Sequence, residues 1–389
     1  MEKSPTVDPS TATKIQITTP YPFCRLQNPS NWEVIRMVLG LLSGLVFLRI
    51  FIFVGLIAVF GSFLVICHHL GFRLLSLYIL RYGCRGLLMA CGHFWIPIDI
   101  DKEYFQKGGC PKIIVSNHLS NMEILHLLTL PFQDDAGNPV PPHFVTKETI
   151  FDIPVVGAIT RDVLGSIGVP RKQKTTTTEN GQQSKPISKS VTEQILERVN
   201  TGVGYGPIVI FAEGTTTNGT CLLSFRKGAF VPMVPVTPVL YSFGAEARDP
   251  KQSTFLPTYE TIWGPAYVWR TLCQPFHRFE CKFLDTISPD ETRLEDKEIE
   301  QASQFAEKVR CQMSLEGDLP MLAEEYNYAH KLKYHSGMLK AFAKHPRGMK
   351  YAMCFAPMQK VFDDSETRLG HDVVQGTKFS VGAESKKNI

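Results

Sequence analysis

A histidine stands just after a short apolar run, and a carboxylate follows it five residues later in the chain. The run 113–115 leads into the segment SNHLSNME at 116–123, which contains His118 and Glu123. An imidazole can take the proton of a hydroxyl group when a carboxylate on its far nitrogen holds it in one tautomer. His118 is therefore a candidate general base and Glu123 its orienting partner, although a lone histidine followed by glutamate also occurs by chance. Asn117 is a candidate either for shaping this turn or for stabilising an oxyanion.

A second group of polar residues ends another apolar run. Glu213, Gly214 and Thr215 follow the run 208–211. Gly214 allows a sharp turn, so the carboxylate and the hydroxyl could face the same rim of a sheet as His118. Without other context, the same residues describe an ordinary turn at the end of a strand.

Two further segments could frame an anionic ligand. Apolar residues alternate from Gly165 and predict a strand that ends at Arg171, whose guanidinium could bind a phosphate group through two hydrogen bonds. A solvated surface arginine is the simpler interpretation of that residue alone. Residues 234–239 (VPVTPV) indicate either a rigid edge strand or a proline-rich loop.

Short apolar runs alternate with helical patterns from about residue 110 onward. Such alternation indicates an α/β domain around a largely buried sheet. The expected strands include 113–115, 143–145, 208–211 and 234–239, and the clearest expected helix is 191–199.

A long apolar segment precedes this domain. From 37 to 67 the only charged residue is Arg49, and 50–67 is a run of 18 uncharged residues, close to the roughly 20 needed to cross a bilayer. A charge at mid-bilayer costs at least about 2.5 kcal/mol. The cost is avoided if 37–48 and 50–67 form a re-entrant hairpin, or if 50–67 spans the membrane and Arg49 extends to the interface. The sequence fits both arrangements.

The rest of the chain is divided by its composition. We expect a polar N-terminal tail at 1–35, the membrane segment at 36–70, an interfacial helix at 71–100, the domain with the candidate site at 101–285, a helical region at 286–360 and a polar tail at 361–389. The polar stretch 172–190 inside the domain is expected to be a flexible insertion.

Composition argues against several classes of protein. Of 389 residues, 44% are hydrophobic and 20% are charged, which is typical of a folded chain. The net charge is +4, and no zinc-finger spacing or basic aromatic helix is present, so no nucleic-acid partner is indicated. The ten cysteines form no CxxC pair, so no metal site is indicated, and their scatter suits reduced thiols. The polar N-terminus predicts no signal peptide.

In this order and spacing, the four segments resemble the four blocks of the glycerolipid acyltransferase superfamily. Those blocks are a histidine and an acid separated by four residues, a strand ending in arginine, Glu-Gly-Thr, and a proline-rich apolar strand. The stretch 211–230 (FAEGTTTNGTCLLSFRKGAF) looks most like the branch that acylates lysophosphatidylcholine and lysophosphatidylethanolamine. Two residues depart from the family: Glu123 replaces its usual aspartate, and Ala212 replaces its usual proline.

The resemblance implies a mixed sheet flanked by helices, with a membrane helix or hairpin before it. It also implies transfer of an acyl group from acyl-CoA to a lysophospholipid hydroxyl, by direct attack on the thioester and with no metal or cofactor. His118 would be the general base and Glu123 its orienter. The residues implied in acceptor binding are Arg171, Glu213, Gly214, Thr215 and Asn117, and the candidates for binding the CoA phosphates are Lys147, Arg226 and Lys227.

Three other interpretations fit the same residues. A glycerol-3-phosphate or lysophosphatidate acyltransferase would share the motifs, because the choice of acceptor depends on pocket shape. A catalytically inactive membrane scaffold could keep the fold, and Glu123 in place of aspartate leaves that option open. A serine-type lipid hydrolase is the third, but the chain has no Gly-x-Ser-x-Gly motif to support it.

Two short motifs concern location. Lys386 and Lys387 stand at positions −4 and −3 and resemble the retrieval signal of endoplasmic reticulum membrane proteins. We therefore expect an endoplasmic reticulum membrane protein with a cytosolic active site, in contact with acyl-CoA, lysophospholipid and membrane lipids. Residues 218–220 match a glycosylation sequon, which we expect to be unused because a glycan there would obstruct the proposed site.

Overall fold

The computed structural model describes residues 22–23, 31–100, 111–134, 136–169, 190–201, 206–243, 264–289 and 298–332. Within these ranges a seven-stranded sheet forms the central layer, in the order β1-β7-β6-β2-β5-β3-β4. The strands are β1 (Ile98–Asp99), β2 (Ile113–Ser116), β3 (His143–Lys147), β4 (Ile167–Val169), β5 (Ile208–Phe211), β6 (Val236–Ser242) and β7 (Glu280–Phe283).

The sheet is mixed, as the sequence resemblance implied. β2 pairs in parallel with β5 and β6, and β3 pairs in parallel with β4 and β5. β7 runs antiparallel to β6 and parallel to β1. The two central strands β2 and β5 end in register, with Ser116 opposite Phe211, so the residues that follow them emerge at the same edge of the sheet. Ligands of open α/β sheets bind at this carboxyl edge.

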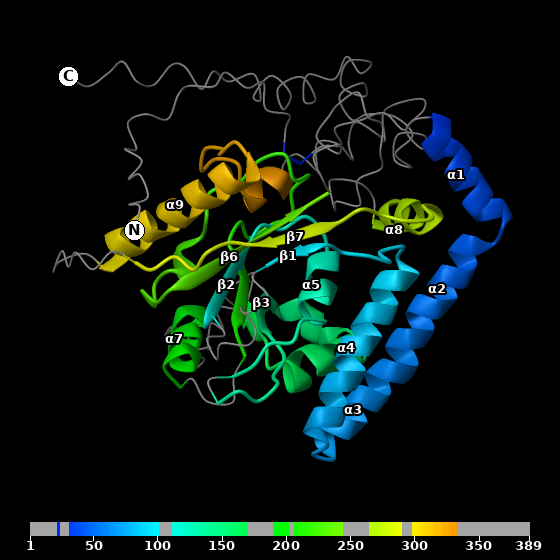
Figure 1. The fold of residues 1–389 in the computed structure, drawn as a ribbon, viewed down its shortest axis with the longest axis horizontal. Coiled ribbons are helices and arrows are strands. Elements are labelled where there is room, and N and C mark those ends of the chain that lie inside the picture. Colours follow the sequence, from blue (N-terminus) through cyan, green and yellow to red (C-terminus); the bar gives the residue numbers. More distant parts are fainter. Residues whose placement is uncertain are drawn as a thin grey trace, which may run out of the picture.

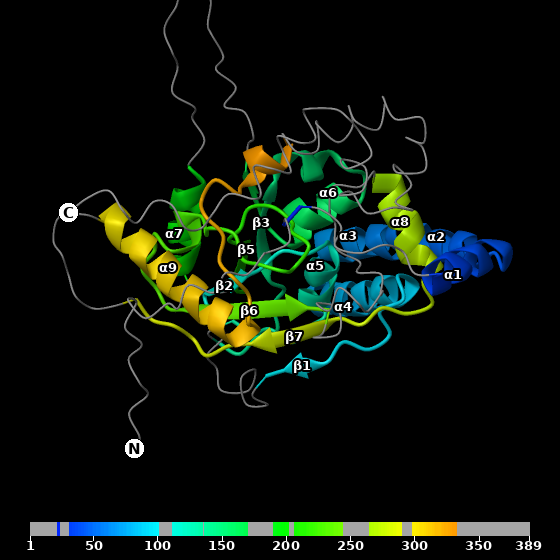
Figure 2. The ribbon, with the colours of Figure 1, turned by 90° about the horizontal axis from the view of Figure 1, so that it is seen from above.

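Helices cover both faces of the sheet (Figures 1 and 2). The described helices are α1 (Asn31–Leu42), α2 (Leu45–Gly55), α3 (Ser62–His69), α4 (Arg73–Ala90), α5 (Met122–Leu127), α6 (Val156–Ala158), α7 (Val191–Thr201), α8 (Gly264–Cys273) and α9 (Glu298–Gly317). Short 3₁₀ segments lie at η3 (Glu148–Asp152) and η5 (Lys227–Ala229), and π-helical segments at η2 (Leu56–Gly61) and η4 (Ile159–Val163).

Each central strand divides its side chains between two cores, because successive side chains of a strand point to opposite faces. Ile113 and Val115 belong to the core that includes side chains of α7 and α9. Ile114, between them in β2, belongs to the core that includes side chains of α4, α5 and α8. β2 is buried along its whole length, as expected for a central parallel strand.

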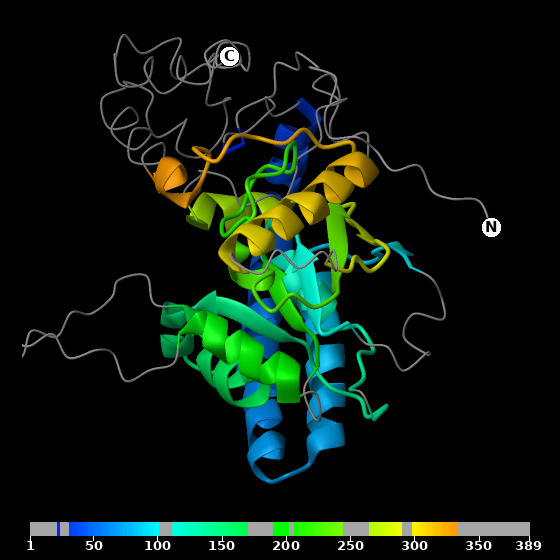
Figure 3. The ribbon, with the colours of Figure 1, turned by 90° about the vertical axis from the view of Figure 1, so that its left-hand side faces the viewer.

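A helical hairpin lies along the second of these faces. The helix Leu45–His69, formed by α2, η2 and α3, is long and apolar enough to cross a membrane by length and composition. A short turn leads into α4, which packs beside it (Figures 1 and 3). Large exposed apolar side chains on the hairpin include Phe47, Leu48, Phe51, Val59, Phe60, Phe63, Leu74 and Tyr78. Such a surface suits contact with lipid.

The helix break that was expected at Arg49 lies instead between α1 and α2. α1 ends at Leu42, and Gly44 adopts a left-handed conformation with φ of 72° before α2 begins. The chain then continues as helix through Arg49, so a hairpin that turns at Arg49 is wrong. Gly44 accounts for the position of the break, because a residue without Cβ adopts positive φ at little cost.

Arg49 is buried rather than directed to an interface, which corrects the second expected arrangement. Its side chain is 6% exposed, and the guanidinium donates to the carbonyl oxygens of Leu272 (2.9 Å), Pro275 (2.7 Å) and Gln274. These acceptors lie at the carboxyl end of α8, where the helix dipole is negative and carbonyl groups lack helical partners. Arg49 therefore fastens the apolar hairpin to the domain that carries the sheet.

We predict that Arg49→Met destabilises the folded protein by about 2–5 kcal/mol, because it leaves several buried carbonyl groups without a donor. Thermal unfolding in detergent would measure the loss. Arg36→Met is the matched control, since Arg36 is an exposed arginine in the preceding helix α1. Equal stability of the two variants would contradict a fastening role for Arg49.

Candidate active site

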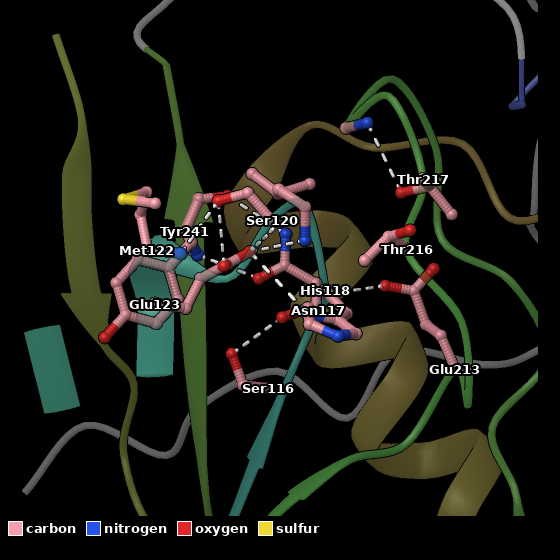
Figure 4. Close-up of polar contacts among 12 residues, drawn as sticks. Ser116, Asn117, His118, Ser120, Met122, Glu123, Glu213, Thr216, Thr217 and Tyr241 are labelled. Carbon is pink, nitrogen blue, oxygen red and sulfur yellow. Dashed lines mark hydrogen bonds and ion pairs between the residues drawn. The ribbon is translucent and has the colours of Figure 1, made fainter. Parts of the chain in front are cut away.

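The candidate site lies where β2 and β5 end side by side. His118 follows β2 by two residues, and Glu213 follows β5 by two residues. Because the two strands are parallel and in register, their following turns meet. The main-chain N–H of His118 donates to Oε1 of Glu213 at 3.0 Å (Figure 4). The N–H of Leu223 donates to Oε2 of the same carboxylate at 3.1 Å. The structure therefore brings these two predicted site residues into direct contact.

Glu123 holds the other part of the same turn. Its Oε1 accepts the main-chain N–H groups of Leu119 and Ser120, the latter at 2.7 Å, and its Oε2 accepts the hydroxyl of Ser120 at 3.1 Å. The carboxylate is fully buried. Three consecutive main-chain N–H groups, those of residues 118, 119 and 120, are thus bound by two carboxylates, which fixes the backbone of the histidine.

The contacts of Ser120 and Glu123 resemble a capping box just before α5, whose N-cap is Asn121. The Ser120 hydroxyl accepts the N–H of Met122 at 3.1 Å, while Glu123 reaches back to the N–H of Ser120. The pattern Ser-x-x-Glu at a helix start is the sequence signature of this motif. The sequence prediction assigned no role to Ser120, although this local signal was present.

The imidazole of His118 is positioned by stacking and by the nearby carboxylate. Its ring lies on the ring of Phe211, with centroids 4.1 Å apart and planes 19° apart. Nδ1 is buried without a hydrogen bond and lies 3.9 Å from Oε1 of Glu123, while the side chain as a whole is 17% exposed. The exposed part of the ring is therefore on the Nε2 side, where a substrate hydroxyl could approach.

Asn117 is directed toward a neighbouring strand. Its Nδ2 donates to the carbonyl oxygen of Tyr241 at 2.9 Å, and its Oδ1 accepts the N–H of Tyr241 at 2.8 Å (Figure 4). The side chain thereby continues the pairing of β2 with β6 beyond the end of β2. Of the two roles weighed for Asn117, this contact supports shaping of the turn.

Three of the other predicted residues, Gly214, Thr215 and Arg226, lie around the turn that follows β5. Gly214 is exposed and adopts φ of 68°, and Thr215 is buried behind it. A Cβ on Gly214 would collide with the side chain of Arg226, so a glycine is required for this arginine to lie across the turn. Arg226 is exposed, and it places a positive charge at the rim of the site. Arg171 lies outside the described residues, as does the insertion at 172–190.

Burial controls the charge of Glu213. The removal of this carboxylate from water is the main cause that raises its pKa to about 7. The N–H groups of Leu223 and His118 and the charge of Arg310 oppose the rise, and the negative charge of Glu123 adds a smaller part to it. Protonation of Glu213 near neutral pH relieves the repulsion between the two carboxylates.

An apolar cavity of about 540 Å³ opens beside the turn. It lies between the helical hairpin, α5, α8 and β3, and its lining includes Phe53, Phe60, Gly83, Asn121, Met122 and Tyr267. Asn121 and Met122 belong to the segment that joins His118 to α5. The volume is within the range of about 300–1,000 Å³ that is typical of small-molecule sites. The cavity thus offers space for an apolar group next to the turn, while His118 itself is not part of its lining.

The described residues contain no group of three or more His, Cys, Asp and Glu side chains that could hold a metal ion. The sequon at 218–220 is folded into the site: Asn218 is 2% exposed, and its Oδ1 accepts both the N–H and the hydroxyl of Thr220. A glycan on Asn218 is therefore incompatible with the folded chain.

A histidine and two carboxylates thus lie at the carboxyl edge of the sheet, in the same domain as an apolar cavity. Residues 98–242 match the family model described as Acyltransferase. The part of the chain that contains His118, Glu123 and Glu213 is thus similar to the acyltransferase family.

Characterised relatives support this assignment. The chain is 30% identical over 277 residues to lysophospholipid acyltransferase LPEAT1 of Arabidopsis thaliana, which covers 66% of this chain and 62% of that protein. It is 33% identical over 171 residues to lysophosphatidylcholine acyltransferase of Drosophila melanogaster, over 44% of this chain and 28% of the relative. With human lysophosphatidylcholine acyltransferase 1 the identity is 36% over 103 residues, or 26% and 18% of the two chains. The chain thus spans less than two thirds of each of these relatives.

One solved structure is similar over a large part of its chain. It is the crystal structure of the 1-acyl-sn-glycerophosphate (LPA) acyltransferase PlsC from Thermotoga maritima, with 19% identity and a TM-score of 0.35 over 69% of this chain and 97% of that chain.

We predict that Glu213→Gln flattens the pH dependence of stability. A carboxylic acid whose pKa is about 7 in the folded state and about 4.5 when unfolded favours folding at low pH. That contribution, on the order of 3 kcal/mol, is present below about pH 4.5 and is lost as the pH rises through 7. Unfolding free energies at pH 5 and pH 8 would measure the difference.

The variant Glu148→Gln, which removes an exposed carboxylate, is the control for this experiment. It should keep the pH dependence of the wild type. If Glu213→Gln also keeps it, the carboxyl of Glu213 does not titrate in the neutral range.

Proposed function

We propose that this protein transfers an acyl group from acyl-CoA to the free hydroxyl of a lysophospholipid. The observation that carries the proposal is the position of His118, whose Nδ1 is buried 3.9 Å from Glu123 while the ring is partly exposed. The acyltransferase family match at 98–242 supports the reaction class, and the names of the relatives from Arabidopsis and Drosophila support a lysophospholipid acceptor.

In the proposed reaction, Nε2 of His118 removes the proton of the acceptor hydroxyl. The hydroxyl oxygen attacks the thioester carbonyl carbon, a C–O bond forms, and the C–S bond breaks. The leaving CoA thiolate then takes the proton from the imidazolium. Glu123 would stabilise the imidazolium through Nδ1, and the 3.9 Å separation would shorten as charge develops, as is common for catalytic contacts that are long before substrate binds.

The cation at the rim supports binding of a phosphate-bearing substrate. Arg226 lies across Gly214 and is exposed, so its planar guanidinium is available to phosphate oxygens. Either the phosphate groups of acyl-CoA or the phosphodiester of the acceptor would satisfy it. Arg171 is proposed for the same chemistry on its position in the family motif alone.

The proposed location is the membrane surface, because both substrates carry acyl chains that reside in or near a bilayer. The exposed apolar side chains of the hairpin support this location. Residence in the endoplasmic reticulum, with the active site in the cytosol, is part of the proposal. Lys386 and Lys387 lie outside the described residues.

The central experiment combines a panel of lysophospholipids with labelled acyl-CoA in membranes that contain the protein. We predict that His118→Ala reduces transfer by about 10²–10⁴-fold, which is the usual contribution of a general base. His69→Ala, which removes an exposed histidine on α3, should retain wild-type activity.

The panel also separates the competing functions. Unchanged transfer by His118→Ala would remove the mechanism. Transfer only to lysophosphatidate or glycerol-3-phosphate would favour the related acyltransferases, and no transfer by the wild type would favour an inactive scaffold.

The cavity is proposed to hold the acyl chain of the donor, which gives a prediction about chain length. Gly83 lines the cavity, and a Cβ at this position would meet nothing within 4 Å. Gly83→Leu should therefore fill part of the space and lower activity with long acyl-CoA by at least about tenfold more than with short acyl-CoA, since loss of cavity volume acts on the ends of long chains.

Gly55→Leu is the matched control, because Gly55 is also helical and a Cβ added there would likewise meet nothing within 4 Å. It does not belong to the cavity lining. The ratio of activities with palmitoyl-CoA and octanoyl-CoA is the readout. The same ratio in both variants would exclude the cavity as the acyl site.

A further inference from the structure

The loop after β5 holds the main chain of His118 from both sides. The N–H of His118 donates to Glu213, and the carbonyl oxygen of His118 accepts the N–H of Thr217 at 2.9 Å. The position of the imidazole therefore depends on residues 213–217 as a unit (Figure 4). What holds this loop consequently also positions the histidine.

The loop is stabilised only in part by its own contacts. The N–H of Gly219 donates to the Thr217 hydroxyl at 3.3 Å, and Thr220 donates to Asn218. Two other contacts come from segments that are distant in sequence, one at each end of the described chain.

The first distant contact is made by Lys331. Its Nζ donates to the carbonyl oxygen of Thr216 at 2.7 Å and to the Thr216 hydroxyl at 2.6 Å, and the residue is 8% exposed. Lys331 lies in a helical segment at 328–332 whose first turn is capped by Asn327: its Oδ1 accepts the N–H groups of Ala329 and His330. The lysine thus extends from a fixed backbone onto the residue next to Thr217.

The second distant contact is made by residues 22 and 23, which precede the first helix. The carbonyl oxygen of Pro22 accepts the N–H of Asn218 at 2.9 Å. Phe23 is fully buried, and Nζ of Lys331 lies 5.7 Å from the centre of its ring, within the distance at which an ammonium group is attracted to an aromatic face. Phe23 thereby supports the lysine that holds Thr216.

We propose that Phe23 and Lys331 are positioning residues for His118: together they hold residues 216–218 so that Thr217 fixes the histidine main chain. Neither side chain touches the imidazole. Lys331 binds Thr216 directly and Phe23 acts through Lys331, while the neighbouring residue Pro22 binds Asn218 on the other side of Thr217. For catalysis, the proposal rests on the proposed acyl transfer; for the geometry of the loop, it rests on the contacts alone.

The test pairs amide hydrogen exchange with kinetics on the full-length protein in detergent. Lys331→Met removes the donor but keeps an apolar stem of similar length. We expect faster exchange of the amides of Thr217 and Asn218 and a fall in kcat of at least about tenfold, because small displacements of a catalytic group are costly. The KM for acyl-CoA should change by less than about twofold, because the loop contact does not bind substrate.

Four further variants define the cause. Lys308→Met is the matched control, because Lys308 also donates to a backbone carbonyl, that of Ser288, but from α9; it should leave exchange of Thr217 and kcat unchanged. Lys331→Arg keeps a hydrogen-bond donor at this position and should therefore retain much of the wild-type kcat. Phe23→Leu, which keeps an apolar side chain but removes the ring, should lower kcat less than Phe23→Ala.

The outcomes separate this proposal from the proposed function. Unchanged exchange of Thr217 in Lys331→Met would overturn the loop-holding role, whatever reaction the protein catalyses. Faster exchange with a wild-type kcat would overturn the positioning of His118. If the wild-type protein transfers no acyl group, the proposed function fails, whereas the exchange data still decide whether Phe23 and Lys331 hold the loop.

Discussion

The structure of the site depends on two buried carboxylates that bind a single turn of main chain. Glu213 and Glu123 accept the N–H groups of residues 118, 119 and 120. A buried N–H without an acceptor costs about 1–3 kcal/mol, so the turn needs both carboxylates to keep this conformation. Burial and mutual repulsion in turn raise the pKa of Glu213. The same residues that shape the site therefore make its stability depend on pH.

The site also depends on the contact between the hairpin and the sheet domain. The apolar cavity has walls from both parts: α2, η2 and α4 on one side, and α5 and α8 on the other. Arg49 bonds to the end of α8, and Tyr267 of α8 shares a hydrogen bond with Ser120 in the histidine turn. The hairpin with the exposed apolar surface and the turn that carries His118 are thus connected through α8.

Much of the sheet could be predicted from the sequence because its central strands are short, continuous apolar runs. The runs at 113–115 and 208–211 became β2 and β5, and parallel pairing of such strands brings His118 and Glu213 together. Contacts between distant segments could not be predicted. Arg49 lies 223 residues from Leu272, Asn117 lies 124 residues from Tyr241, and no local pattern announces either pair. The role of Lys331 could not be predicted from the sequence either, because its partner Thr216 comes within reach only when the loop is folded.

The burial of Arg49 has a consequence for how the chain is made. Its partner Leu272 is synthesised 223 residues later, which at about 5–20 residues per second corresponds to roughly 10–45 s of translation. During that interval the guanidinium emerges within an apolar helix and has no carbonyl oxygens from α8 to bind. The nascent helix must therefore be tolerated with an unneutralised charge until α8 has been synthesised. Arg49 thus makes the packing of the apolar hairpin against the sheet domain wait for a helix that is synthesised much later in the chain.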